Sequence, residues 1–336
     1  MLKNSLKKLL IITMMSVTAH ETEAKIIDVH SHYIGDAYVK YLKEHHAELK
    51  EGYPLPKWDE QTLSDFMNQG GISKAVLSLA PVHPYIDTNS VDFIRKLNED
   101  MARLKQNSNG RYLFCATLPL TDVKAAVKEA DYVYDKLNAD AVLLGSNIDG
   151  QYLGDKELEP LMECLNRHKS VVIVHPHKPY GLADSIFRNI PLAMFEYPAD
   201  TTRAVVNLVM HNVMARYKDI RFVIPHAGSF LGAAIPRIKA IYPVVKARGL
   251  VEDVDIDENI KGLYFDIASV KDVSILKSML SFTDFDHILF GSDFPYISKE
   301  VVLRDLENIR SQMKADKDLA PRLDDILYKN AEKLFK

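Results

Sequence analysis

Short, continuous runs of apolar and β-branched residues recur along the chain after residue 24. Continuous rather than alternating hydrophobicity is typical of strands that are buried on both faces of a parallel sheet. Longer stretches lie between the runs, and Leu158–His168 and Ala199–Tyr217 are examples that we interpret as crossover helices. The pattern predicts eight strands: Ile26–His30, Ala75–Leu79, Leu113–Leu118, Ala141–Leu144, Val171–His175, Phe222–His226, Leu263–Ile267 and Ile288–Gly291.

Eight strand-and-helix units in one chain of this size predict an α/β fold, a (β/α)8 TIM-like barrel. A doubly wound open sheet is the competing architecture, because a short apolar run can also belong to a buried helix. No Gly/Ser linker or internal repeat divides residues 25–336, so we expect one barrel domain. His45–Asp59, which contains the only tryptophan, predicts a loop over one end, and Gly70-Gly71 predicts a helix end before the second strand.

The first 24 residues have the pattern of a targeting signal. Lys3, Lys7 and Lys8 precede the uncharged run Leu9–Ala19, which is too short to span a bilayer. We therefore predict a signal peptide in residues 1–24, export to the periplasm or the medium, and no stable membrane insertion. A short buried helix at the N-terminus is the alternative interpretation.

Composition excludes several functional classes. Hydrophobic residues make up 47% and charged residues 26% of the 336 positions, close to an average globular protein. The net charge of -4 is spread without a basic block, so we expect no nucleic-acid partner. Cys115 and Cys164 are the only cysteines and lack CxxC spacing, which indicates neither a thiolate metal site nor a redox motif. Histidine and aspartate would have to hold any transition metal.

Three histidines and one aspartate lie where predicted strands end, and they are candidate metal ligands or bases. His30, His175 and His226 each close a run, and Asp293 follows the eighth. In a barrel these positions converge on one mouth. Within Asp28–His32, the two histidines at positions 30 and 32 point to the same side of a strand and can hold one ion. The set predicts a His3Asp site, with ligands His30, His32, His175 and Asp293, that suits Zn, Mn or Fe rather than Ca.

Each of these residues also has a simpler interpretation. The histidine pair at 30 and 32 could be hydrogen-bonded strand-end residues. His226 could be a fourth nitrogen ligand or a base beside the metal. We favour the base, because a near-neutral imidazole can move the proton that these reactions need. The third interpretation of His226 is a residue that caps a helix. Pro176 interrupts the strand before His177, so we expect His177 in a loop that touches substrate.

With these residues assembled, the chain resembles the amidohydrolase superfamily, in the amidohydrolase-2 branch that includes aminocarboxymuconate-semialdehyde decarboxylase and the hydroxybenzoate decarboxylases. Its nearest likeness is to 6-methylsalicylate decarboxylase-like proteins. The segments that carry the resemblance are Asp28–His32, Gly52–Trp58, Ala116–Leu120, Gln151–Asp155, Val174–Pro176 and Asp200–Ala204. The resemblance implies a barrel of the metal-dependent hydrolase type with the four ligands named above and His226 as the catalytic histidine.

The resemblance also bears on the cofactor and the partners. Many members of the superfamily bridge two metals with a carboxylated lysine on the fourth strand, but Ala141–Asn147 contains no lysine. We therefore expect one divalent ion, Zn first and Mn second. Relatives often form a homodimer, and the sequence leaves this option open for the present chain. An arginine that grips substrate in some relatives has no clear counterpart here, and Lys57, Lys178 and Arg203 are the candidates to replace it.

These observations favour a non-oxidative decarboxylase, a carboxy-lyase, that acts on a hydroxybenzoate-type or related small carboxylic acid similar to 6-methylsalicylate. We expect Asp293 to deliver the proton to the ring and His226 to polarise the substrate or a water, although the two roles could be exchanged. The predicted substrate-binding residues are Tyr33, Trp58, His177, Phe294 and Tyr296.

Two other functional classes remain open from the sequence. The same ligands would suit a hydrolase of a lactone, cyclic amide or ester, since a bound ion also activates water. Export favours this alternative if the acid is an intracellular catabolite. A non-catalytic protein that binds metal or a small acid would keep the ligands but would have no need of His226.

Overall fold

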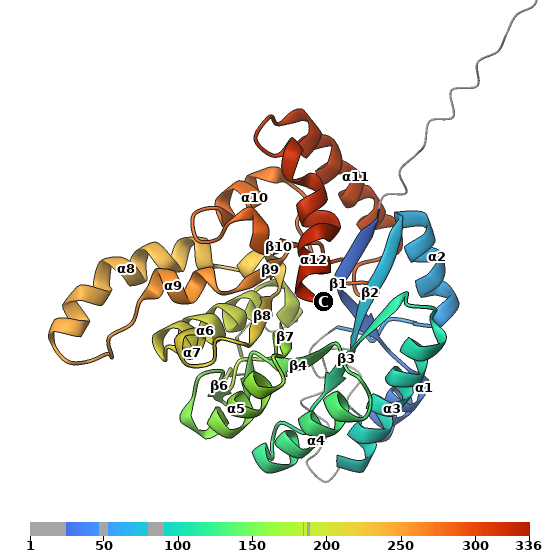
Figure 1. Cartoon of the computed structure of the whole chain (residues 1–336), viewed down its shortest axis with the longest axis horizontal. Coiled ribbons are helices and arrows are strands. Elements are labelled where there is room, and N and C mark those ends of the chain that lie inside the picture. Colours follow the sequence, from blue (N-terminus) through green and yellow to red (C-terminus); the bar gives the residue numbers. More distant parts are fainter. Residues whose placement is uncertain (1–24, 47–52, 80–90, 184, 187–188) are drawn as a thin grey trace, which may run out of the picture.

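The computed structural model describes residues 25–46, 53–79, 91–183, 185–186 and 189–336 (Figure 1). The segment with the predicted signal peptide, residues 1–24, lies outside the described residues, as does part of the predicted loop at residues 47–52. Among the residues that are described, no helix is both long enough and apolar enough to cross a membrane.

The predicted strands form one 8-stranded sheet in the order β1-β2-β3-β4-β7-β8-β9-β10. Neighbouring strands in this order pair in parallel. A parallel bridge between Ser31 and Phe294, with a 2.8 Å hydrogen bond from Asp293 N to His30 O, joins the last strand segment back to the first. This confirms the (β/α)8 barrel and excludes the doubly wound sheet. The bounds are β1 (Ile26–Tyr33), β2 (Ile72–Leu79), β3 (Tyr112–Thr117), β4 (Ala141–Gly145), β7 (Val171–His175), β8 (Arg221–Ile224), β9 (Tyr264–Asp266) and β10 (Ile288–Leu289).

Side chains alternate between the barrel interior and the layer under the helices. On β7, Val171 and Ile173 belong to one buried cluster, whereas Val172 and Val174 belong to the other, which also contains the helix residues Leu161 and Leu165. His175 is two residues beyond Ile173, so it continues the inward-facing series. The strand alternation therefore directs this histidine toward the barrel axis.

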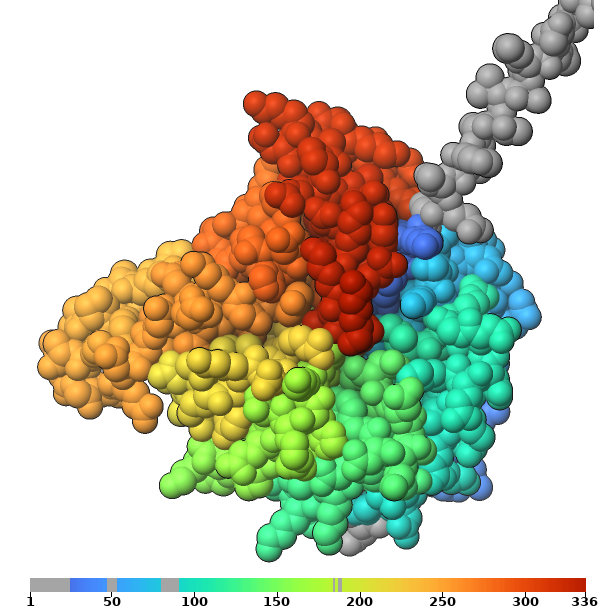
Figure 2. All heavy atoms as spheres, in the orientation of Figure 1, coloured from blue at the N-terminus to red at the C-terminus, as the bar shows by residue number. Residues whose placement is uncertain are grey.

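Helices surround the strands in Figure 1, and the two short strands β5 (Asn147–Ile148) and β6 (Gln151–Tyr152) form a separate hairpin after β4. Figure 2 shows that α8 and α9 project from the body of the molecule. The helix bounds are α1 (Asp36–Glu44), α2 (Glu60–Gly70), α3 (Val91–Asn107), α4 (Val123–Asp135), α5 (Glu159–Arg167), α6 (Glu196–Met210), α7 (Val213–Arg216), α8 (Leu231–Ala247), α9 (Ile256–Lys261), α10 (Val273–Met279), α11 (Lys299–Ala315) and α12 (Asn330–Leu334).

The helix ends follow the local sequence signals. Gly71 adopts φ 65° after the last residue of α2, and its N–H bonds to the carbonyl of Asn68. Glycine is suited to this left-handed position because it lacks a Cβ, so the predicted helix end is confirmed. The helix expected over Ala199–Tyr217 is two helices, since Asn212 adopts φ 53° between α6 and α7.

Candidate metal centre and active site

Three histidines from two strands meet at the carboxyl end of the barrel. His30 and His32 lie on β1 and His175 ends β7. Ligand atoms of the three lie within 4.8 Å of one another, and all three side chains are buried. The ring centroids of His30 and His32 are 5.1 Å apart, and those of His32 and His175 are also 5.1 Å apart. The structure thus brings together the histidines that the sequence predicts as ligands.

The outer nitrogen of each ring has a partner that fixes its orientation. Nδ1 of His30 lies 2.9 Å from Oδ2 of Asp266, and Nδ1 of His32 lies 3.3 Å from Oγ of Ser78. Nδ1 of His175 lies 3.0 Å from the carbonyl of Pro176. With Nδ1 engaged in this way, Nε2 is the nitrogen of each ring that is available to an ion.

Asp293 completes the predicted ligand set from the loop after β10. Its Oδ1 lies 3.2 Å from Nε2 of His32 and 3.7 Å from Nε2 of His30. Burial favours a raised pKa for this carboxyl, but contacts with His226 and His32 and the charge of His30 outweigh burial and hold the pKa well below its ordinary value. Asp293 is therefore an ionised carboxylate at neutral pH.

The donor set fits one divalent ion. Nε2 of His30 is buried and has no hydrogen-bond partner among the described residues, although it faces the carboxylate of Asp293. Burial lowers the pKa of His30. The charge of Asp266 and its hydrogen bond outweigh burial, so the pKa is raised to about 9. A positive charge at this point is what the surrounding carboxylates favour. Three imidazoles and one carboxylate suit Zn or Mn.

His226 lies beside this cluster, after the end of β8. The predicted strand Phe222–His226 is strand only as far as Ile224, and Pro225 precedes a tight turn in which His226 has φ 55°. Nε2 of His226 lies 3.8 Å from Oδ2 of Asp293. Its Nδ1 has no hydrogen-bond partner among the described residues, so the ring does not cap a helix there. Asp293 also has a positive φ, 59°, and such backbone conformations cluster at active sites.

A cavity of about 500 Å³ opens onto the cluster. His175, His226 and Asp293 line it together with Tyr296, which the sequence predicts as a wall residue. The remaining described residues that line it are Tyr53, Pro191, Ala193, Met194, Tyr197, Pro198, Ser269 and Ile297. Lys57, Lys178 and Arg203, the candidates for the substrate-gripping cation, are not among them.

The other predicted wall residues lie elsewhere. Phe294 is buried and stacks on Phe66 at a centroid distance of 4.4 Å. Tyr33 and Trp58 pack edge to face against each other at 4.9 Å and are not among the residues lining the cavity. His177 is buried in the loop after β7, and its ring occupies the space that a side chain at Gly145 would need. The strand-end position therefore does not by itself identify an aromatic residue that faces substrate.

Several contributors to the site are not predicted from the sequence, among them Asp266, Tyr53 and Met194. Asp266 is the only carboxylate within the predicted run Leu263–Ile267. A charged residue inside a predicted buried strand could have identified it as a candidate site residue. Tyr53 lies in the long loop after α1, where sequence gives no direction for a side chain. Met194 lies in a short 3-10 turn, Leu192–Met194, between β7 and α6.

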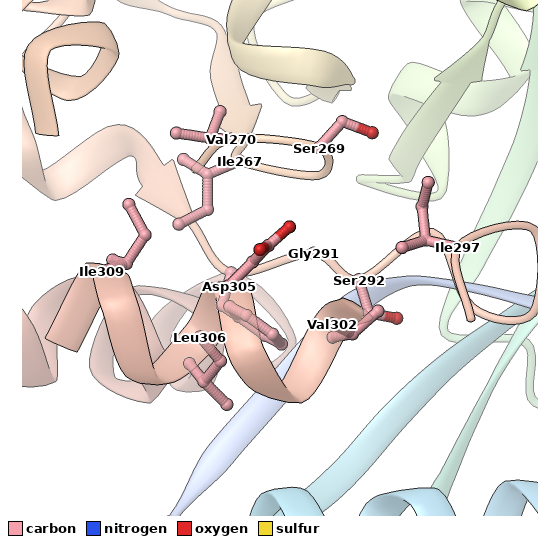
Figure 3. Close-up of a pocket in the computed structure, with 11 residues that line it drawn as sticks. Ile267, Ser269, Val270, Gly291, Ser292, Ile297, Val302, Asp305, Leu306 and Ile309 are labelled. Carbon is pink, nitrogen blue, oxygen red and sulfur yellow. The ribbon is translucent and has the colours of Figure 1, made fainter. Parts of the chain in front are cut away.

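A second, much smaller hollow of about 30 Å³ adjoins the cavity. Ser269 and Ile297 line both spaces. Figure 3 shows side chains of α11, including Val302 and Leu306, on one side of the hollow and the segment after β9 on the other. The hollow has room for about one water and carries none of the predicted catalytic residues.

Another group of potential ligands lies between α4 and α5. Asp131, Cys164 and His168 have ligand atoms within 4.8 Å of one another. The Arg167 guanidinium contacts Oδ1 of Asp131 at 2.6 Å, and its positive charge opposes the binding of a metal cation there. Burial and Asp131 raise the pKa of the Cys164 thiol to about 11, so it is protonated. We interpret this arrangement as a hydrogen-bonded ion pair.

Comparison with known proteins places this geometry in a family. A 6-methylsalicylic acid decarboxylase from Penicillium expansum is 30% identical over 288 residues, which cover 83% of this chain and 87% of that protein. A crystal structure of an amidohydrolase II superposes with a TM-score of 0.83 at 29% identity, covering 92% of this chain and 99% of the other.

A dihydroxybenzoic acid decarboxylase from Polaromonas, solved with manganese and the inhibitor 2-nitroresorcinol, superposes with a TM-score of 0.76. It is 17% identical, with 93% of this chain and 96% of that chain covered, so this likeness concerns the fold. The amidohydrolase family matches residues 27–336, nearly all of the described barrel. This chain belongs to the amidohydrolase family.

Proposed function

We propose that this chain is a metal-dependent, non-oxidative decarboxylase of a hydroxybenzoate-type acid, with a ring similar to that of 6-methylsalicylate. That it is an enzyme of the carboxy-lyase class follows from its named relatives, whereas the substrate and the choice of Zn or Mn belong to the proposal. The observation that supports the proposal most directly is that the carboxylate of Asp293 faces two histidines. Oδ1 of Asp293 faces the ligand His32 at 3.2 Å, and Oδ2 faces His226 at 3.8 Å.

The ion, when held by the three histidines and Asp293, supplies Lewis acidity toward the carboxylate of the substrate and a neighbouring hydroxyl. Loss of carbon dioxide leaves an electron pair on a ring carbon, and a proton must reach that carbon. Asp293 is an anion at rest because its pKa is well below the ordinary value. It must therefore first accept a proton at Oδ2, and Nε2 of His226 is the neighbouring donor. In this proposal Asp293 passes the proton to the ring and His226 supplies it.

The cavity walls support this chemistry by limiting solvent around the carboxylate. Tyr197 and Tyr296 line the cavity beside the buried His175. Most of the described residues that line the cavity are apolar or aromatic, so a substrate carboxylate would lose part of its hydration there. Carbon dioxide is neutral and loses less by this desolvation than the carboxylate from which it forms.

The test is an assay on the metal-loaded chain with salicylate, 2-hydroxy-6-methylbenzoate and 2,6-dihydroxybenzoate, and with a lactone, a cyclic amide and an ester. We expect carbon dioxide from at least one acid and no hydrolysis. A His226→Ala variant keeps the ligands and should lose turnover, whereas His287→Ala, at a surface ion pair, should not. Hydrolysis without carbon dioxide release would establish the hydrolase instead. Export and a homodimer stay predictions.

A further inference from the structure

We propose that Asp28 is a positioning residue for the metal centre, and that it acts through Ser292 to hold the carboxylate of Asp293 against the ligand histidines. Asp28 is fully buried and is not among the residues that line the cavity, so it acts on the site only through its neighbours. Its effect on turnover rests on the proposed function, whereas its effect on ion binding is measured without a substrate.

The carboxyl group of Asp28 joins the two segments of chain that carry the ligands. Its Oδ1 accepts the backbone N–H of His30 at 3.1 Å and that of Ser292 at 3.0 Å. Its Oδ2 accepts the hydroxyl of Ser292 at 2.5 Å. Asp28 and Ser292 are 264 positions apart in the sequence. A single buried group thus ties β1 to the segment that follows β10.

Further hydrogen bonds hold the chain on both sides of Asp293. The backbone N–H of Asp293 donates to the carbonyl of His30 at 2.8 Å, and that of His32 donates to the carbonyl of Phe294 at 2.7 Å. Oγ of Ser292 accepts the N–H of Phe294 at 3.0 Å. Asp293 has a φ of 59°, a conformation that costs free energy unless the surroundings impose it. These contacts impose it, and they place its carboxylate beside Nε2 of His32.

The two segments also approach too closely for a side chain between them. A Cβ at Gly291 would lie 2.8 Å from Cβ of His30 and 3.1 Å from Cγ of Asp266. The pairing of β1 with β2 is irregular between Asp28 and Ser31, and such irregularities re-aim side chains next to active sites. Asp28 bonds the N–H of His30 within this irregular stretch. It therefore fixes the backbone of a ligand strand as well as the segment that carries Asp293.

The first experiment titrates Co²⁺ into the metal-free chain and follows its visible absorption, which reports the ligands around the ion. Ser292→Ala removes the hydroxyl, whereas Asp28→Asn keeps one oxygen for the two backbone N–H groups and loses the oxygen that accepts the hydroxyl. We expect each variant to raise the dissociation constant about tenfold and to shift the spectrum toward that of Asp293→Ala. An unchanged constant and spectrum in both variants would overturn the proposal.

A conservative variant should rescue the site. Ser292→Thr keeps the hydroxyl, and Ser292 lines the hollow of about 30 Å³ shown in Figure 3, where the added methyl group has space. We expect the wild-type spectrum and dissociation constant in Ser292→Thr. A site as weak in Ser292→Thr as in Ser292→Ala would contradict a role for the hydroxyl.

The matched control is Asp140→Asn. Asp140 accepts the backbone N–H of Phe114 at 2.7 Å and joins the amino end of β4 to β3, opposite the strand ends that carry the ligands. This variant should bind Co²⁺ like the wild type even where denaturant unfolding shows that its stability is lower. A dissociation constant raised as far as that of Ser292→Ala would show a general effect of the fold and would overturn the positioning role.

A double variant shows whether Ser292 acts through Asp293. Residues that act through one shared group are not additive in their effects. The dissociation constant of Ser292→Ala/Asp293→Ala should therefore match that of Asp293→Ala within about twofold, because no carboxylate is left to position. A further tenfold loss in the double variant would contradict the proposal.

Turnover separates this proposal from the proposed function. With saturating ion and an acid that the wild type decarboxylates, Asp28→Asn should lower kcat about tenfold or more and leave KM within about twofold, since misplacing a reacting group by about 1 Å can cost about 10²-fold. If the wild type binds Co²⁺ and releases no carbon dioxide, the proposed function fails and the Co²⁺ results still decide the role of Asp28. Carbon dioxide release with unchanged Co²⁺ binding in the variants would keep the proposed function and overturn that role.

Discussion

Oδ2 of Asp266 lies 2.9 Å from Nδ1 of His30, and the two side chains are 0% and 1% exposed. The other oxygen of the same carboxylate accepts the backbone N–H groups of His226 at 3.1 Å and Ala268 at 2.9 Å. One buried residue at the end of β9 thus orients His30, a proposed metal ligand, and the turn that carries His226, the proposed catalytic histidine. Partners of this kind fix the ring of a ligand and raise its basicity.

Replacement of Asp266 by asparagine should therefore weaken metal binding. We expect the dissociation constant for Zn or Mn to rise about 10- to 100-fold, the usual effect of removing a residue that orients a ligand. Competition with a chromophoric chelator measures this constant. Asp257→Asn, at an exposed position of α9, is the control and should bind metal like the wild type. An unchanged dissociation constant in Asp266→Asn would contradict the proposal that Asp266 orients the ligand His30.

Metal binding should release a proton at neutral pH. The pKa of His30 is about 9 in the metal-free chain, so its imidazole is protonated below that pH and must lose its proton to bind an ion. The affinity should rise with pH, by about tenfold per unit below pH 9, as expected for one displaced proton. Calorimetry in buffers with different ionisation enthalpies counts the protons. A count near zero at pH 7 would contradict the assignment.

Removal of the His226 ring should affect turnover and not metal content. A general acid or base contributes about 10²- to 10⁴-fold to the rate, and His226→Gln should lower kcat by a factor in that range. Elemental analysis of the same preparation should still find one ion per chain. Loss of the ion together with activity would make His226 a fourth ligand, the role that the sequence also left open.

The hydrogen-bond network around the buried Asp200 should contribute to the free energy of unfolding. Asp200 accepts hydrogen bonds from Ser146 Oγ at 2.5 Å, Asn147 Nδ2 at 2.6 Å and Tyr152 Oη at 2.5 Å. Asp200→Ala leaves these donors without their acceptor and should lower the free energy of unfolding by about 3 kcal/mol or more. Tyr152→Phe removes one donor and should cost about 1 kcal/mol. Denaturant unfolding measures both, and equal losses would contradict the network.

The parts of this structure that sequence predicts are those set by short-range patterns. The eight apolar runs form the barrel strands because continuous hydrophobicity reports burial on both faces. The strand-end positions of His30, His32 and His175 are enough to group these residues, since strand ends in a barrel converge. Alternation along a strand then fixes which of its side chains face inward.

The parts that sequence does not predict depend on turns and on long-range packing. The positive φ angles of His226 and Asp293 aim both side chains, yet neither residue type indicates such a conformation. Phe294 follows Asp293 directly but packs on Phe66 of α2, a contact between residues far apart in the chain. The rim of the cavity comes from a loop between β7 and α6, whose path no periodicity describes.

Decarboxylation in heavy water shows whether this chain replaces a ring carboxylate by a proton. The metal-loaded chain is incubated with 2-hydroxy-6-methylbenzoate in D₂O, and the product is examined by proton and carbon NMR. We predict 3-methylphenol with one deuterium at the carbon that lost the carboxylate. It should form only when the ion is present, and more slowly in His226→Gln. An unchanged acid, together with metal-dependent hydrolysis of a lactone or ester by the same preparation, would contradict it.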